Sequence, residues 1–111
     1  MRKVTFKIDD VQFFRKLFKR RNPKLTEKQI DELVSDMKPS FKAMFTLYGN
    51  SNFPDRYELT DIDGKQINMN DLNGYQKGCI ITDCYAYFEG REYSENADSP
   101  CGVIEIIDTE E

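Results

Sequence analysis

Residues 3–20 read Lys-Val-Thr-Phe-Lys-Ile-Asp-Asp-Val-Gln-Phe-Phe-Arg-Lys-Leu-Phe-Lys-Arg, and the hydrophobic period changes within this stretch. Up to position 8, apolar and polar residues alternate, which predicts a strand with one buried face. From Val11 onward the apolar residues recur at helical spacing, and Asp9 or Asp10 can cap the helix. A strand that leads directly into an amphipathic helix predicts a fold that mixes both kinds of element.

Residues 26–48 predict a second helix, and their last part fits either a third helix or a strand. Thr26-Glu27-Lys28-Gln29 has the spacing of a capping box, and Pro39 ends or kinks the helix that starts there. Residues 40–48 fit two patterns, because apolar residues recur both at helical spacing and in alternation. We predict a helix over 40–48, with a strand as the alternative.

The second half of the chain has the period of strands. After a loop at 50–55, Arg56–Asp61 and Lys65–Met69 flank Asp63-Gly64, a strong hairpin signal. Residues 79–88 form the longest strand candidate and 102–107 the last. We therefore predict an α+β fold in one domain, 1–111. Within this domain, residues 1–49 are expected to be mostly helical and basic, and residues 50–111 mostly β and acidic. The N-terminal strand and two or three helices pack on an antiparallel sheet formed mainly by residues 56–107.

Charge is distributed unevenly along the chain. Residues 1–43 carry twelve Lys and Arg against six Asp and Glu, whereas residues 44–111 carry four against fourteen, and the net charge is −4. A basic stretch attracts phosphate or an acidic partner, and an acidic stretch attracts a basic partner or imitates a nucleic-acid backbone. Binding is therefore the expected function.

The composition argues against catalysis. The chain contains no histidine, so the commonest general base is missing. Asp61 with Asp63, or Asp83 with Glu105, could meet across strands, but fourteen acids in this half make such proximity expected by chance. We predict that the protein is not an enzyme and that it binds no cofactor.

Metal sites and membrane spans are also not expected. Cys79, Cys84 and Cys101 are odd in number and lack the spacing of a zinc site or a disulfide framework. Asp61-Ile62-Asp63-Gly64 departs from a calcium loop, because its glycine comes too early. No signal-peptide run or long apolar segment is present, so we expect a cytoplasmic protein.

Three stretches of the second half resemble the last strands of phage single-stranded-DNA-binding proteins of the OB type. They are Tyr57–Lys65 with its Asp-Gly-Lys turn, Gly78–Phe88, and Gly102–Ile107. The resemblance covers less than half of the chain and implies single-stranded nucleic acid as a ligand.

In size, acidity and aromatic content the chain is similar to inhibitors encoded by phages and mobile elements, including anti-CRISPR proteins, which occupy nucleic-acid-binding surfaces. This likeness implies a basic nucleic-acid-binding protein as partner. The predicted contact residues are acids and tyrosines: Asp83, Tyr85, Tyr87, Glu89, Glu92, Tyr93 and Glu95. The alternative is a single-stranded nucleic-acid-binding protein that uses Arg15, Lys16, Lys19, Arg20, Tyr85 and Tyr87.

Overall fold

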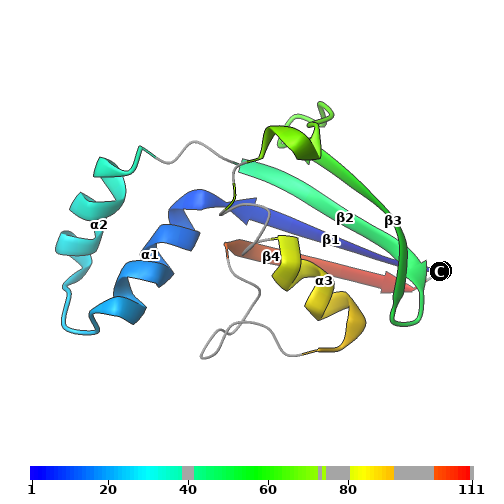
Figure 1. Ribbon diagram of the computed structural model, residues 1–111, viewed down its shortest axis with the longest axis horizontal. Coiled ribbons are helices and arrows are strands. Elements are labelled where there is room, and N and C mark those ends of the chain that lie inside the picture. Colours follow the sequence, from blue (N-terminus) through cyan, green and yellow to red (C-terminus); the bar gives the residue numbers. More distant parts are fainter. Residues whose placement is uncertain (39–41, 73, 75–80, 92–101, 111) are drawn as a thin grey trace.

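The computed structural model describes residues 1–38, 42–72, 74, 81–91 and 102–110 (Figure 1). Its elements follow the order β1 (Arg2–Asp9), α1 (Asp10–Arg21), α2 (Glu27–Asp36), β2 (Lys42–Asn50), β3 (Phe53–Asp61), a short 3-10 helix η1 (Met69–Asp71), α3 (Thr82–Glu89) and β4 (Val103–Glu110). The strands form one antiparallel sheet in the order β3-β2-β1-β4. The predicted α+β fold is therefore confirmed.

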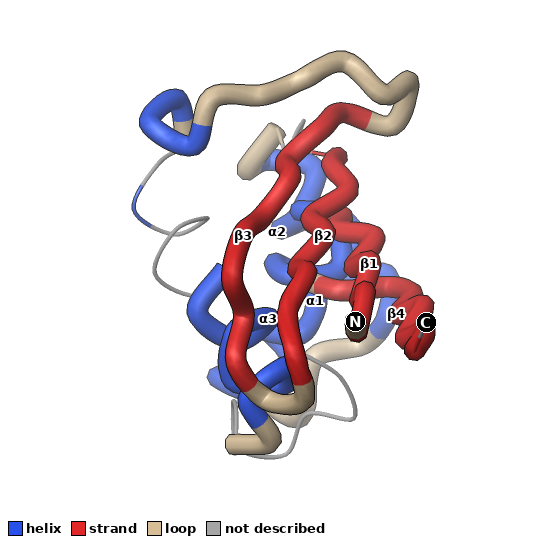
Figure 2. The backbone as a smooth tube through the Cα atoms, turned by 90° about the vertical axis from the view of Figure 1, so that its right-hand side faces the viewer, coloured by secondary structure: helices blue, strands red, loops and turns tan. Residues whose placement is uncertain are grey.

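One face of the sheet carries the core. Phe6 in β1 lies opposite Phe45 in β2 and Ile106 in β4. Helix α3 packs on this inner face and adds Cys84 and Phe88, both fully buried. The α-helices lie behind the strands in Figure 2, and no described helix lies over the outer face. The sheet is thus a single layer with one covered and one open side.

Strand β2 corrects the prediction of a helix over 40–48, of which positions 40 and 41 lie outside the described residues. Its inward residues Ala43, Phe45 and Leu47 are at most 1 % exposed, and they pair side by side with the inward residues of β1. Pairing with β1 decides between the two patterns, because it places the alternating set Ala43, Phe45 and Leu47 on the covered face. Gly49, which resembles a helix stop, lies at a β-bulge opposite Pro54. A Cβ at Gly49 would clash with the Phe53 carbonyl and lie 2.8 Å from the Pro54 Cα.

The loop predicted at 50–55 is much shorter, since β3 already begins at Phe53. The turn at Asp63-Gly64 is confirmed: Gly64 has a positive φ of 89°, and Asp61 Oδ1 accepts hydrogen bonds from the backbone N–H groups of Asp63 and Lys65. The strand predicted over 65–69 is reduced to a single bridge between Gln66 and Thr60. Asp61 therefore acts as a turn residue.

Helix α3 overturns the strand predicted over 79–88, of which positions 79 and 80 lie outside the described residues. Ile81, Cys84 and Phe88 recur at helical spacing and are buried. Gly90 ends the helix in the left-handed region at φ 73°, and the Arg91 N–H donates to the Ala86 carbonyl. The sheet consequently takes two of its four strands, β1 and β2, from the first half of the chain, and not mainly from 56–107.

The capping box predicted at the start of α2 is confirmed. The Gln29 N–H donates to the Thr26 hydroxyl over 3.2 Å, and the Thr26 N–H donates to Gln29 Oε1 over 2.9 Å. Thr26→Ala is expected to lower the free energy of unfolding by about 1 kcal/mol. Urea denaturation can measure this change, with the exposed Lys28→Ala as control. Equal stability of the two variants would contradict a capping role for Thr26.

Candidate protein-interaction surface

Two of the three tyrosines predicted as contact residues, Tyr85 and Tyr87, pack against the core. Tyr87 meets Phe6 edge-on with ring centroids 5.6 Å apart, and Tyr85 lies 5.8 Å from the Phe45 ring. Burial, followed by the neighbouring Tyr57 hydroxyl, raises the pKa of Tyr85. Both rings therefore hold α3 on the sheet, and neither is free to stack on a nucleic-acid base.

The predicted acids are not gathered into one surface by the described residues. Asp83 and Glu89 are half-buried on α3, and Glu89 accepts hydrogen bonds from the Arg91 guanidinium at 3.3 Å. Glu105 pairs with Lys7 on the open face at 2.8 Å, so it does not meet Asp83 across strands. Glu92, Tyr93 and Glu95 lie outside the described residues.

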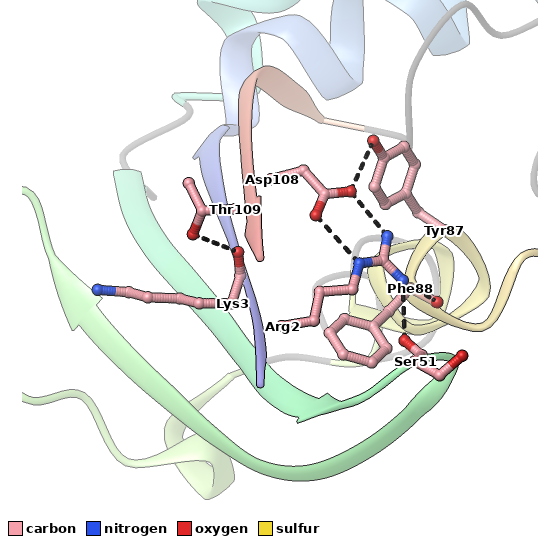
Figure 3. Close-up of polar contacts among 7 residues, drawn as sticks. All are labelled: Arg2, Lys3, Ser51, Tyr87, Phe88, Asp108 and Thr109. Carbon is pink, nitrogen blue, oxygen red and sulfur yellow. Dashed lines mark hydrogen bonds and ion pairs between the residues drawn. The ribbon is translucent and has the colours of Figure 1, made fainter. Parts of the chain in front are cut away.

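An arginine that the sequence did not single out joins four segments of the chain (Figure 3). Arg2 forms a two-point contact with Asp108 of β4, at 3.0 and 2.7 Å. Its guanidinium also donates to the Phe88 carbonyl at the end of α3 (2.7 Å) and to the Ser51 carbonyl in the β2–β3 turn (3.2 Å). The hydrogen bond from Arg2 lowers the pKa of Asp108 below its ordinary value of 3.8. This pair fixes the sheet, α3 and the turn to one another.

The basic residues predicted on α1, which are Arg15, Lys16, Lys19 and Arg20, differ in their contacts. Arg15 forms ion pairs with Glu27 and Asp31 of α2, and the hydrogen bond with Asp31 is the largest cause of its raised pKa. Lys19 Nζ donates to the Leu25 carbonyl at 3.0 Å. These two side chains therefore position α2 against α1. Of the four predicted phosphate contacts, Lys16, Lys19 and Arg20 are exposed, and Arg15 is half-buried.

A different part of the molecule brings acids and exposed apolar groups together along β3 and the turn that follows it. Phe53 is 76 % exposed, Tyr57 45 % and Ile62 63 %. Exposed carboxylates lie between and beside them in the chain; Tyr57 leans toward the covered face of the sheet and Glu58 toward the open face, so the two meet at the edge. We call this surface the acidic edge: Phe53, Asp55, Tyr57, Glu58, Ile62 and Asp63. Apolar patches on a soluble protein mark interaction sites more often than scattered apolar residues do.

The acidic edge belongs to an edge strand of the sheet. β3 pairs with β2 on one side. On its other side, Leu59 and Asp61 bond to Ile67 and Lys65 through the backbone. Among the described residues, no strand pairs with the outer side of β3 between Phe53 and Glu58, so this half of the strand offers backbone groups as well as side chains.

The one cation within this half of β3 is directed toward the open face. The Arg56 guanidinium lies 3.9 Å from the Tyr48 ring centroid, and its Nη1 is 3.4 Å from Glu58 Oε1. Lys3 approaches the same ring at 5.7 Å. Arg56 thus offsets some of the negative charge of Glu58, while Asp55 and Asp63 have no ion pair among the described residues.

The described residues contain no group of three His, Cys, Asp or Glu side chains placed to hold a metal ion. None of the described helices has the length and apolar character needed to cross a bilayer. Comparisons with protein-family models, curated proteins and solved structures found no match to this chain.

Proposed function

We propose that this protein is a non-catalytic inhibitor that binds a basic nucleic-acid-binding protein in the cytoplasm through its acidic edge. In this respect it would act like the inhibitors that phages and mobile elements encode, anti-CRISPR proteins among them. One observation carries the proposal: three large apolar side chains are exposed among carboxylates along an edge strand and the turn that follows it.

Each component of the acidic edge would contribute differently to binding. Carboxylates steer a basic partner toward the surface and suppress acidic ones, mainly through the association rate. Phe53 and Tyr57 are aromatic, and such residues supply most of the binding energy at protein interfaces when a partner covers them. The free side of β3 adds backbone groups that can bond to an extended segment of the partner. Shielding of the partner's basic groove would then exclude its nucleic acid.

The absence of catalysis belongs to the same proposal. Asp61 holds the turn that follows β3, Glu105 pairs with Lys7, and Asp108 pairs with Arg2. These carboxylates therefore have structural partners, and a catalytic site needs several complementary groups around one reacting atom.

The alternative, a single-stranded nucleic-acid-binding protein, has weaker support. Tyr85 and Tyr87 face the core, and Arg15 is paired with two carboxylates of α2. The tyrosines that would stack on bases and two of the four basic residues, Arg15 and Lys19, are thus used within the fold.

Inhibition of a Cas9–guide RNA complex tests the proposal, because that complex holds nucleic acid in a positively charged channel. The fraction of labelled target DNA bound by the complex would be measured by gel shift with increasing inhibitor. We expect the wild type to reduce DNA binding. The variant Asp55→Lys/Glu58→Lys/Asp63→Lys should lose more than roughly tenfold in potency, since steering and paired contacts are both reversed.

Asp83→Lys/Glu89→Lys is the comparison variant, since it reverses acids of α3 outside the acidic edge. Its potency should stay close to that of the wild type. A larger loss of potency in this variant than in the acidic-edge variant would indicate that the binding surface lies on α3. No inhibition of Cas9 or of a second single-protein CRISPR effector would reject the anti-CRISPR form of the proposal.

A further inference from the structure

A second charged surface lies at the turn between α1 and α2, away from the acidic edge. Arg20 and Arg21 end α1, Lys24 lies in the connecting loop, and Lys28 lies in the first turn of α2. We call these four exposed residues the basic tip. We propose that the basic tip binds the phosphate backbone of double-stranded nucleic acid without reading its sequence.

The connection between the two helices is short and internally bonded, so it keeps the four cations together. The Asn22 N–H donates to the Phe18 carbonyl at 3.0 Å, and the Leu25 N–H donates to the Asn22 carbonyl at 3.1 Å. The Lys24 N–H donates to the Asn22 side chain at 3.2 Å. Lys19 and Arg15 bind the two helices to each other and leave the tip cations directed to solvent.

The described carboxylates do not hold the cations of the basic tip in ion pairs. Glu27 and Asp31, the first two acids of α2, pair with Arg15. No ion pair joins any of the four tip cations to another described residue. The helix dipoles do not neutralise them either, since the negative end of α1 (about −0.5 charge) lies beside the positive end of α2 (about +0.5). All four tip cations are therefore available for contacts with phosphates.

The overall net charge of −4 does not prevent this contact. The basic tip lies at one end of the long axis of the molecule, and the chain ends and the β2–β3 turn lie at the other (Figure 1). The molecule measures 43 Å along that axis. Since charges are screened over about 8 Å at physiological salt, repulsion from the distant acids is small at the tip.

The surroundings of the tip favour nucleic acid over a lipid surface. None of the exposed large apolar side chains of the described chain lies between positions 19 and 28. A peripheral membrane helix needs an apolar face to enter the interface, and this tip offers only charge. The tip also lacks an exposed aromatic ring for base stacking, so contacts with phosphates are what remain.

Fluorescence anisotropy with a labelled 20-base-pair DNA duplex tests this inference. If four phosphates are neutralised, the affinity should fall roughly 100-fold between 50 and 200 mM NaCl, because the salt slope is about −0.9 per contact. The variant Arg20→Gln/Arg21→Gln should reduce the magnitude of that slope by about 1.8. The matched control Lys42→Gln/Lys65→Gln removes the same charge from two exposed sites outside the tip and should leave the slope unchanged.

Three results would overturn the inference. They are no duplex binding by the wild type at 50 mM NaCl, an equal change in slope for both variants, and binding to vesicles that contain phosphatidylserine without binding to the duplex. Circular dichroism of each variant establishes that it is folded, and all exchanged residues are exposed. The inference does not rest on the acidic edge, so duplex binding should persist in the Asp55→Lys/Glu58→Lys/Asp63→Lys variant.

Discussion

Phe45→Ala is expected to lower the free energy of unfolding by about 3–5 kcal/mol, the usual cost of emptying an aromatic site in a core. Phe45 is fully buried in a central strand of the sheet. Its ring contacts Phe6, Tyr57 and Tyr85, with centroids 5.8 to 6.4 Å away. Truncation would therefore remove the ring that contacts β1, β3 and α3. In a urea titration at room temperature, we expect part of the variant to be unfolded already at the lowest urea concentrations.

Met44→Ala is the matched control. Comparison of its stability with that of Phe45→Ala distinguishes a strand from a helix over these residues. In β2, Met44 points to the open face and Phe45 to the core, so the control should cost less than about 1 kcal/mol. In a helix with Phe41, Met44, Phe45 and Tyr48 on one side, both residues would be buried. Similar losses for the two variants would contradict the placement of β2.

Arg2→Ala should have the second largest effect, a loss of about 2–3 kcal/mol, because charge-assisted hydrogen bonds are stronger than neutral ones. The substitution removes the two-point contact with Asp108 and the bonds to the Phe88 and Ser51 carbonyls. It also removes a cation from the Phe88 ring, whose centroid is 4.5 Å away. The neighbouring Lys3→Ala, on the open face, is the control and should cost well under half as much.

The same pair predicts a dependence on pH. Arg2 depresses the pKa of folded Asp108 below 3.8, so this pair stabilises the fold above that pH and loses its contribution as the pH falls through the lower, folded-state value. The stability difference between the wild type and Asp108→Asn should therefore be largest near neutral pH and shrink below about pH 4. A difference that stays constant down to about pH 2.5 would contradict the pairing.

Local signals predicted the elements that depend on local chemistry. The change of period at Asp9 and the capping box at Thr26 mark β1, α1 and α2, because a cap and the helix it starts are only a few residues apart. The Asp63-Gly64 turn was predictable for the same reason, since its hydrogen bonds span at most four residues.

The errors have two causes: one local pattern fits both kinds of element, and other contacts join distant residues. Ile81, Thr82, Tyr85 and Tyr87 favour strands by composition, yet this segment becomes α3, which buries Ile81, Cys84 and Phe88 at helical spacing and ends at Gly90. That spacing was a visible signal. The pairing of Arg2 with Asp108, by contrast, joins residues 106 positions apart and has no local pattern.

The candidate site also combines features that local sequence predicts with features that depend on distant contacts. The hairpin signal predicted a strand over Arg56–Asp61, but the place of β3 at an edge of the sheet depends on pairing with β2. The exposure of Phe53, Tyr57 and Ile62 follows from that place. Acidity in the second half was visible in the sequence, whereas the strand that gathers acids beside exposed apolar groups was not.

Titration of the ¹⁵N-labelled protein with a ten-residue peptide of alternating arginine and leucine tests the central claim most directly. The peptide mimics a basic, extended segment of a partner, and amide chemical shifts locate where it binds. We predict that the largest shift changes fall between Phe53 and Asp63, and that they disappear in the Asp55→Lys/Glu58→Lys/Asp63→Lys variant. Shift changes centred on α3, or none in this segment at millimolar peptide, would contradict the proposed surface.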